Sequence, residues 1–365
     1  MMRHYRWVEL APIPENGVLV HTGLPKTGST SLQGVLYGKR QQVADLGVLL
    51  QSPETWYRGA VMDGRPERQQ ALRSLQRAVR GHSGRVFITN ELLCDASAEQ
   101  AEQLVRGFGR PTKVLTMVRS FPDLLPSVWQ QRVKGGQEIP PSYEEWLRSA
   151  IDDASRSSAG FWLRHDLDRV FDAWARAVGE ENLVFVVVDR SEPNRSSAAI
   201  EQLLGLPAGM LAGTAKGRSK NRSWPYATVE MVRQIQLGSG LDKIQRRQLM
   251  KMAKRRMAKE GWVGDPIPIP QWAVDGIRPH AQSFVDLLAG SRATVLGDPA
   301  VLCEPTRTPT PHLEPPGEVP MATAVAATTA SLKYVQRARK QQRVAPAESQ
   351  TRPPWYRRVF TVGRA

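Results

Sequence analysis

The sequence VLVHTGLPKTGSTSL, residues 18–32, is the most informative stretch of this 365-residue chain. Three apolar residues lead into a turn that contains two glycines and a proline, and a run with helical character follows from Ser29. This pattern predicts a buried strand, a tight turn and a helix start. A helix start exposes unpaired backbone N–H groups and the positive end of the helix dipole, so it favours an anion. We interpret the stretch as a phosphate-binding loop.

The position of the lysine narrows the kind of loop. Gly23 and Gly28 have the G-x-x-x-x-G spacing of nucleotide-triphosphate loops, and Thr30 stands where that motif has Ser or Thr. Ser29 follows the second glycine, however, and Lys26 lies inside the loop instead. The displaced lysine favours a different anion, namely one phosphate with a transferable group beside it. The alternative is a strand-to-helix turn with an N-capping Ser or Thr, which needs no lysine.

Composition limits the function less sharply than the loop does. The formal charge is +15, of which residues 305–365 carry +7. A basic protein suits a polyanionic nucleotide, an acidic acceptor or nucleic acid, so charge alone does not choose among them. The two cysteines, Cys94 and Cys303, form neither a metal-ligand spacing nor a disulfide framework. With no secretory signal and no apolar run near the ~20 residues that span a bilayer, we expect a cytoplasmic protein without a transmembrane segment.

Strand and helix patterns alternate along the chain, which predicts an α/β fold with a parallel sheet flanked by helices. Expected strands cover residues 17–22, 48–50, 85–91, 113–119, 183–188 and 293–296. Expected helices cover residues 29–45, 67–80, 97–107, 196–205, 226–238, 242–260 and 271–290, and the region 143–178 reads as helical, first at 143–147 and then at 166–174.

The same patterns divide the chain into three parts. Residues 1–16 are a lead-in, and residues 17–304 form one P-loop-type domain with a helical C-terminal part. Residues 305–365 are a basic tail rich in Pro, Ala and Thr, which we expect to be mostly disordered apart from a short helix near 328–342.

Polar residues follow three of the expected strands. They are the loop at 23–30, the pair Asn90-Glu91, and Arg119. Ligands of parallel sheets bind beyond the carboxyl ends of the strands, so these groups should converge at one edge.

Two motifs resemble a known family. Leu24-Pro25-Lys26-Thr27-Gly28-Ser29-Thr30-Ser31-Leu32-Gln33 is similar to the 5′-phosphosulfate loop of sulfotransferases, in the form typical of bacterial and carbohydrate sulfotransferases. The second motif is an arginine that ends a strand with a serine eight positions on, here Arg119 and Ser127. The family places that pair on the 3′-phosphate of 3′-phosphoadenosine 5′-phosphosulfate.

The resemblance covers residues 17–304. Segments 90–93, 161–167 and 221–223 resemble a subgroup of bacterial sulfotransferase-like proteins. The family's usual C-terminal Arg-Lys-Gly loop is not clearly present, although 216–218 is similar to the Lys-Gly-Arg of the heparan-type branch.

The resemblance implies an enzyme that moves a sulfuryl group from 3′-phosphoadenosine 5′-phosphosulfate to a hydroxyl or amine, without a metal. The acceptor would be an unknown carbohydrate, lipid or small metabolite. The implied 5′-phosphate site is Pro25, Lys26, Thr27, Gly28, Ser29 and Thr30. Lys26 would stabilise charge on the bridging oxygen, and Arg119 and Ser127 would bind the 3′-phosphate.

In-line transfer also needs a base. Glu91 is the first candidate because it ends an expected strand on the ligand side. Glu54 is the second, because heparan-type sulfotransferases carry a base glutamate after the first helix. His21 is the third, although a strand-end histidine can equally orient the turn. His165 lies in a helical context, where a structural role is expected.

Two other functions stay open. A magnesium-dependent kinase or NTPase could use Asp189, at the end of an apolar strand, as a metal-side carboxylate. A non-catalytic nucleotide-binding scaffold would use the tail as its working part. The basic helix at 242–260 is either a solvated face or a support for an acidic acceptor. No specific nucleic-acid binding is expected, and the basic tail is a candidate for contact with anionic surfaces.

Overall fold

The computed structural model describes residues 9–51, 66–152, 161–189, 191–213, 223–260, 263–314 and 316–344. The chain divides into two units. Unit 1 comprises residues 1–131, 140–224 and 266–315, and unit 2 comprises residues 132–139, 225–265 and 316–365.

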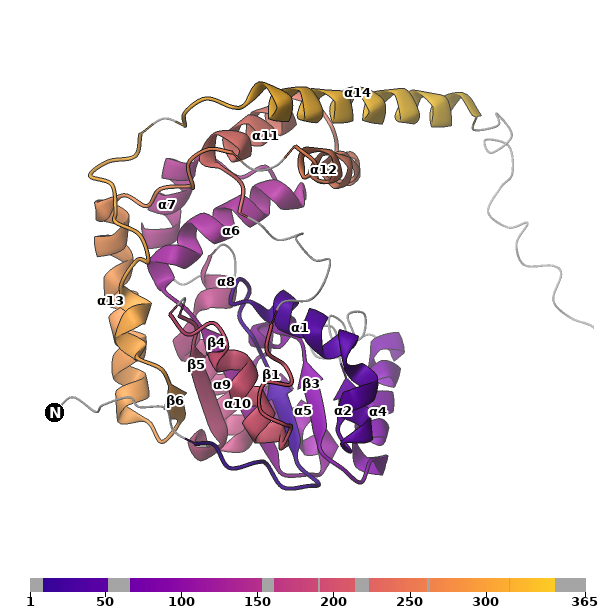
Figure 1. Ribbon diagram of the computed structural model, residues 1–365, viewed down its shortest axis with the longest axis vertical. Helices are drawn as coiled ribbons and strands as arrows, with labels where there is room; N and C mark the ends of the chain where they lie inside the picture. The colour runs from indigo at the N-terminus through magenta and orange to yellow at the C-terminus, as the bar shows by residue number, and fades with distance from the viewer. Residues whose placement is uncertain are drawn as a thin grey trace, which may run out of the picture. The chain divides into compact units, whose positions relative to one another are not determined.

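Unit 1 contains a six-stranded sheet in the order β2-β3-β1-β4-β5-β6, in which every neighbouring pair is parallel (Figure 1). The strands are β1 (Val18–His21), β2 (Leu49–Gln51), β3 (Val86–Thr89), β4 (Thr112–Val118), β5 (Leu183–Val187) and β6 (Thr294–Leu296). The predicted α/β fold with a parallel sheet is therefore confirmed. Strand β1 lies between β3 and β4, so the loop that follows it emerges beside the ends of both neighbours.

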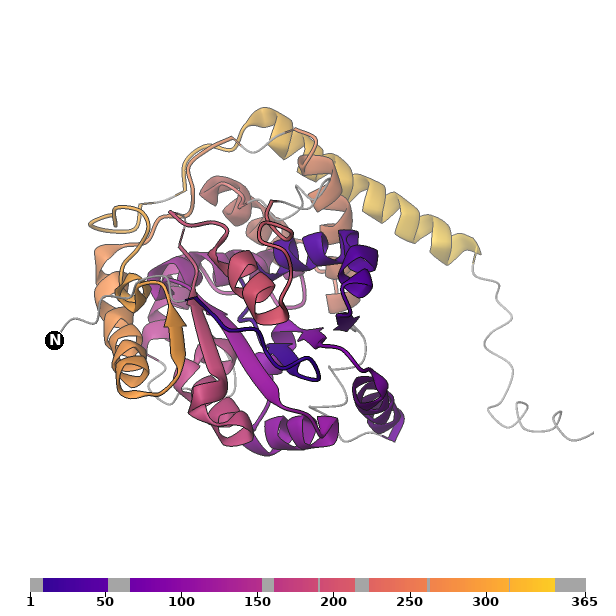
Figure 2. The same cartoon turned by 60° about the horizontal axis from the view of Figure 1, so that its bottom comes forward.

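Helices cover both faces of this sheet. The elements are α1 (Ser29–Gly38), α2 (Arg40–Asp45), α4 (Pro66–Gly81), η1 (Glu91–Asp95), α5 (Ala98–Phe108), α6 (Phe121–Gly135, which continues into unit 2), α7 (Tyr143–Asp152), α8 (Trp162–His165), α9 (Leu167–Val178), η2 (Glu180–Asn182), α10 (Arg195–Leu204), α13 (Gln271–Gly290) and η4 (Pro299–Cys303). Figure 2 shows the helices around the sheet from a second direction.

Successive side chains of each strand point to opposite faces of the sheet, where they pack against different helices. Leu19, Phe87 and Leu115 point to one side, where they form a core with apolar residues of α1, α2 and α10. Phe185 points to the other side and stacks with Phe171 of α9 at 5.9 Å. A strand that is buried on both faces reads as a continuous apolar run, which explains why these strands were readable in the sequence.

The structure corrects several expected boundaries. The single helix expected at 29–45 is two helices with a break at Lys39, and β3 ends at Thr89 rather than at residue 91. Asn90 leaves the strand and caps η1 by accepting a hydrogen bond from the Leu92 backbone N–H at 2.9 Å. Glu91 is therefore the first residue of a 3₁₀ helix and does not end a strand, because the cap at Asn90 turns the chain.

Helix α6 was not predicted. Pro126 lies inside it, and an interior proline removes a helical hydrogen bond. Tertiary contacts fix the helix nevertheless: the Trp129 ring lies 4.9 Å from that of Tyr143 and donates from Nε1 to the Pro141 carbonyl at 3.2 Å. The helical reading of 143–178 is confirmed at α7, α8 and α9, which are separate elements, and residues 153–160 lie outside the described residues.

Unit 2 is helical where it is described. It contains α11 (Tyr226–Gly238), α12 (Lys243–Met257) and α14 (Met321–Val344), and α12 packs against α14. The short helix expected near 328–342 is part of α14, which begins earlier, at Met321. Residues 345–365 of the expected tail lie outside the described residues. None of the described helices is both long and apolar enough to cross a membrane.

Candidate functional site

Residues 22–28 connect β1 to α1 and form the loop at the centre of the site. Gly28 adopts a left-handed conformation with φ 98° and occupies the N-cap position of α1. Among the described side chains, none caps this helix start. The first-turn N–H groups of a helix have no intrahelical acceptor, so this uncapped end is suited to an anion.

Lys26 is held in an unusual backbone conformation. Its φ is 76°, and among the described residues it alone is a non-glycine with positive φ. The left-handed region costs an L-residue about 1–2 kcal/mol, so this conformation is strained. The Lys26 ammonium donates to Oε1 of Gln131, on α6, at 2.7 Å. Strain at a charged loop residue is typical of a position kept for function rather than for stability.

The hydroxyl groups of the loop are used inside it. Thr27 Oγ1 donates to the Leu24 carbonyl at 2.7 Å, and Thr27 and Ser29 are each only 2% exposed. The Thr27 and Ser29 hydroxyls also lie 3.4 Å apart, so both are engaged within the loop. Thr30 lies in the first turn of α1, and its side chain is not among those described.

His21 lies beneath the loop and is completely buried. Its Nδ1 is 2.8 Å from Thr89 Oγ1, which also accepts from Gln33 of α1 at 3.3 Å. A Cβ on Gly23 would lie 2.5 Å from His21 Nε2, so only glycine fits above the ring. Burial lowers the pKa of His21 to about 4, which keeps the imidazole neutral. This geometry fits a support for the loop better than contact with an acceptor.

Arg119 follows β4 and reaches the loop from the neighbouring strand. Its Nη1 donates to the Lys26 carbonyl at 3.0 Å, and its Nη2 lies 3.3 Å from Asp123 Oδ2 on α6. The Asp123 carboxylate also accepts from the Thr306 backbone N–H at 3.2 Å. Ser127 is half-buried one helical turn after Asp123, so the two share a face of α6. The structure thus brings Arg119 and Lys26 together across 93 positions of sequence.

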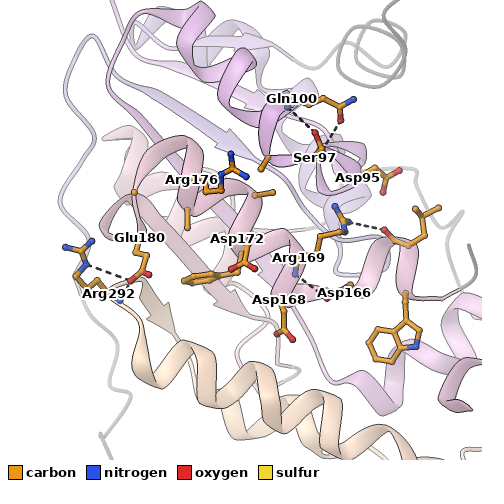
Figure 3. A pocket seen from close by; sticks show the side chains of 17 residues that line it. Asp95, Ser97, Gln100, Asp166, Asp168, Arg169, Asp172, Arg176, Glu180 and Arg292 are labelled. Atoms are coloured by element: carbon orange, nitrogen blue, oxygen red, sulfur yellow. Dashed lines mark hydrogen bonds and ion pairs between the residues drawn. The ribbon is translucent and has the colours of Figure 1, made fainter. Parts of the chain in front are cut away.

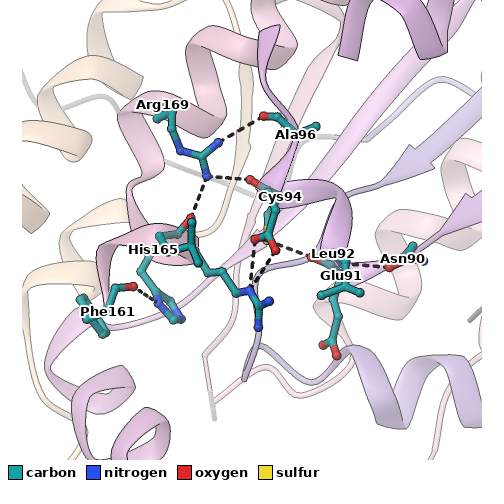
Figure 4. A network of polar contacts seen from close by, with 11 residues as sticks. Asn90, Glu91, Leu92, Cys94, Ala96, Phe161, His165 and Arg169 are labelled. Atoms are coloured by element: carbon teal, nitrogen blue, oxygen red, sulfur yellow. Dashed lines mark hydrogen bonds and ion pairs between the residues drawn. The ribbon is translucent and has the colours of Figure 1, made fainter. Parts of the chain in front are cut away.

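Glu91 shares the electrostatic environment of Lys26. Burial raises the pKa of the Glu91 carboxyl, while the positive charges of Lys26 and Arg164 oppose that rise. Figure 4 shows the Glu91 carboxylate pointing away from Cys94 and Arg169. The charge of Lys26 thus acts on the carboxyl group that follows the third predicted strand.

A network of polar contacts fixes η1, which carries Glu91 (Figure 4). Asp95, nearly buried, pairs with Arg164 at 3.0 Å. Arg169 donates to the carbonyls of Cys94 at 2.8 Å and Ala96 at 3.2 Å. His165 is buried nearby, with its Nδ1 2.8 Å from the Phe161 carbonyl, which fits the expected structural role.

Other candidates lie apart from the loop or outside the described residues. Glu54 and residues 216–218 are not described. The Asp189 carboxylate accepts from the backbone N–H and the hydroxyl of Ser191 at 3.0 and 2.7 Å. It follows β5, two strands from β1, which is about 10 Å at ordinary strand spacing. Within the described part of the chain, no cluster of three or more His, Cys, Asp or Glu residues could hold a metal ion.

An open pocket of about 1100 Å³ runs along α9 and includes none of the loop residues (Figure 3). Five carboxylates outnumber three guanidinium groups in its lining: Asp95, Asp166, Asp168, Asp172 and Glu180 against Arg169, Arg176 and Arg292. Burial raises the pKa of Asp172, and the negative charges of Asp168 and Asp166 add to that rise. Carboxylates crowded in this way disfavour an anion, so the pocket is not a second place for the phosphate group predicted at the loop.

Sequence reasoning missed two residues of the site, Gln131 and Asp123. Both lie on α6, and the helix itself was not predicted. The spacing of Asp123 four positions after Arg119 is a signal that could have been used, because it is the spacing of a helical ion pair. Gln131 has no signal in the sequence, since only the tertiary structure places it beside Lys26.

Comparison with known proteins gives limited information. No protein-family model and no curated protein matches this chain. A solved sulfotransferase from Alicyclobacillus acidocaldarius is similar to it, with 16% sequence identity, a TM-score of 0.39, and coverage of 67% of this chain and 100% of that one. A likeness at this level carries no argument.

Proposed function

We propose that this protein transfers a sulfuryl group from 3′-phosphoadenosine 5′-phosphosulfate to a hydroxyl or amine of an acceptor. The observation that carries the proposal is the 3.0 Å hydrogen bond from Arg119 to the Lys26 carbonyl. It joins a cation at the end of β4 to a strained lysine at the start of α1. Two cationic groups at one edge of the sheet suit a donor that carries two separate phosphates.

The donor set of the loop fits a phosphate. The start of α1 has no side-chain cap among the described residues, and Gly28 there is fully open, since a Cβ would meet nothing within 4 Å. Backbone N–H groups at an uncapped helix start bind phosphate without help from a metal. When bound, 3′-phosphoadenosine 5′-phosphosulfate supplies an activated sulfuryl group, whose transfer breaks the sulfur–oxygen bond to the 5′-phosphate.

In this proposal each residue has a separate task. The backbone N–H groups of residues 27–30 hold the 5′-phosphate, and the Thr30 hydroxyl adds a donor. The Lys26 ammonium stabilises the negative charge that develops on the departing phosphate oxygen. Arg119 and Ser127 hold the 3′-phosphate, where a guanidinium offers paired, charge-assisted hydrogen bonds.

Glu91 takes the proton from the acceptor in this proposal. Its pKa is raised by burial, and a base works best when its pKa approaches the pH of the reaction. Its carboxylate is negative only above that pKa, so the rate of transfer should fall as the pH drops through it. The positive charge of Lys26 opposes this rise in the Glu91 pKa.

Calorimetric titration with adenosine 3′,5′-bisphosphate in the presence of EDTA tests the nucleotide site. We expect binding by the unmodified protein, and a loss of about 30-fold or more in affinity for both Lys26→Ala and Arg119→Ala, because each removes a charged hydrogen bond worth about 2–3 kcal/mol. Arg73→Ala on the exposed face of α4 is a matched control and should bind normally. Absence of binding, together with magnesium-dependent binding of ATP, would overturn the proposal.

The acceptor can be sought by incubating cell extract with radiolabelled donor. Once an acceptor is found, Glu91→Gln should retain nucleotide affinity and lose about 100-fold or more in transfer rate, as expected for a missing general base. Glu91→Asp should recover part of the rate. An unchanged rate in Glu91→Gln would eliminate Glu91 as the base while leaving the nucleotide site intact.

A further inference from the structure

Positive charge is concentrated in unit 2. Its 99 residues contain 20 Lys and Arg against 7 Asp and Glu, a net charge of +13. The 266 residues of unit 1 contain 30 against 28, a net charge of +2. The basic character of the chain is therefore a property of this helical unit and not of the unit that holds the phosphate-binding loop.

Helix α12 presents part of this charge as a row. Lys243, Arg247, Lys251 and Arg255 recur every fourth residue, and all four are exposed. Positions four apart are neighbours on one helix face, where like charges disfavour the helix. Within the described residues, no ion pair joins any of the four to a carboxylate. This uncompensated row is expected of a surface that meets a polyanion.

Exposed apolar side chains are concentrated in the same unit. Of the ten large apolar residues that are exposed in the described part of the chain, seven belong to unit 2: Leu237, Ile244, Val263, Met321, Val325, Leu332 and Val335. Ile244 is 67% exposed and lies on α12 between Lys243 and Arg247. Unit 2 thus exposes cations and aliphatic groups together.

Helix α14 has two apolar faces of different kinds. One face is buried and lined by small residues, Thr323, Ala326, Ala327 and Ala330, with Tyr334. This face fits the packing of α14 on α12, which Figure 1 shows side by side. The opposite face carries Met321, Val325 and Leu332, which are 81%, 58% and 60% exposed, and continues to Val335. The 3.6-residue helical period places these residues on one stripe about 21 Å long.

We propose that unit 2 docks the protein on an anionic lipid bilayer. The exposed stripe of α14 would lie at the acyl boundary, and the cations of unit 2 would face the lipid headgroups. An anionic membrane satisfies both features at once, because an interfacial helix gains from buried aliphatic groups and from attraction to charged lipid. A nucleic acid would account for the cations but not for the exposed aliphatic stripe. Pairing with a second copy would cover the stripe but would bring two units of net charge +13 together.

Vesicle flotation of the full chain tests the proposal, and the result is independent of the nucleotide site. We expect the protein to float with vesicles of phosphatidylcholine containing phosphatidylserine, to float poorly with phosphatidylcholine alone, and to be released by salt. Each cation near an anionic leaflet contributes about fivefold to partitioning. The double variant Lys251→Gln with Arg255→Gln should therefore lose about 25-fold. Arg73→Gln with Arg77→Gln, an exposed pair of the same spacing on α4 of unit 1, is the control and should float normally.

A second pair of variants tests the apolar stripe. Leu332→Gln should lose about tenfold in partitioning, since it removes one large aliphatic group from the acyl boundary. Leu46→Gln, at an exposed leucine of unit 1, should have no effect. Unchanged helix content by circular dichroism and an unchanged thermal unfolding transition show that each variant is folded.

Three results would overturn the proposal. The first is equal flotation with neutral and anionic vesicles, or none with either. The second is tight binding to a duplex oligonucleotide that the α12 double variant abolishes and Leu332→Gln leaves unchanged. The third is a stable dimer in analytical ultracentrifugation that Leu332→Gln dissociates.

Discussion

Asp123 and Arg119 should have opposite effects on nucleotide binding. Asp123 holds the guanidinium of Arg119 at 3.3 Å in a partly buried ion pair, with 22% of the arginine side chain and 12% of the aspartate side chain exposed. A bound 3′-phosphate would compete with Asp123 for that guanidinium. Replacing Asp123 with asparagine should therefore tighten the binding of adenosine 3′,5′-bisphosphate, whereas Arg119→Ala should weaken it.

The magnitudes follow from these contacts. Arg119→Ala loses a charged hydrogen bond to the ligand, about 2 kcal/mol, and leaves Asp123 as an unpaired negative charge, which adds about 1 kcal/mol of repulsion. The dissociation constant should rise about 100-fold. Asp123→Asn removes the competition at a gain of about 1 kcal/mol, roughly fivefold. Asparagine Oδ1 can still accept from the Thr306 N–H, so the surrounding backbone keeps its contact.

Calorimetric titration of the two single variants and the double variant measures the coupling directly. The double variant should bind more tightly than Arg119→Ala and more weakly than the unmodified protein. Glu144→Gln is the matched control, because Glu144 pairs with Arg148 at 2.7 Å with the same spacing on the exposed face of α7. Weaker binding by Asp123→Asn, or normal binding by Arg119→Ala, would refute the placement of a phosphate at Arg119.

Three further predictions concern stability. Lys26→Gly and Lys26→Ala should lose nucleotide affinity to the same extent. In urea denaturation the glycine variant should be about 1 kcal/mol more stable than the alanine variant, because alanine retains the strain of the left-handed conformation. Equal stabilities would show that residue 26 is not strained. Burial lowers the His21 pKa from 6.5 to about 4, so the free energy of unfolding should be highest above pH 6.5 and should fall by about 3 kcal/mol as the pH drops towards 4. His21→Gln should flatten this part of the stability–pH curve, and an unchanged slope would contradict the assignment. Arg110 donates to three backbone carbonyls around the 79–84 turn, so Arg110→Met should cost about 2–4 kcal/mol in thermal unfolding, whereas exposed Arg106→Met should cost almost nothing.

The boundaries of the sheet were predictable to different degrees. The apolar runs at β1, β4 and β5 are buried on both faces, and a strand in such a position has a continuous apolar sequence. The predicted end of β3 was wrong, because the polar residues Asn90 and Glu91 resemble the end of a strand. In the structure the Asn90 side chain caps a new helix instead. Helix α6 was missed because Pro126 argues against a helix locally, and buried contacts of Trp129 outweigh that preference.

Within the candidate site, the sequence by itself determined which chemical groups are available. The order of apolar run, glycine-bearing turn and helix start specifies an anion-binding loop, because strand burial, backbone freedom and exposed N–H groups are all local properties. It also specified the lysine inside that loop and an arginine after another buried strand.

Only the tertiary structure decided how those groups act on one another. The pairing of β1 with β4 puts Arg119 on the Lys26 carbonyl, and α6 brings Gln131 to the Lys26 ammonium across 105 positions of sequence. The same is true of His21, whose burial beneath Gly23 makes it a neutral support. These relations depend on contacts between residues far apart in the chain, and neither residue type nor local spacing encodes such contacts.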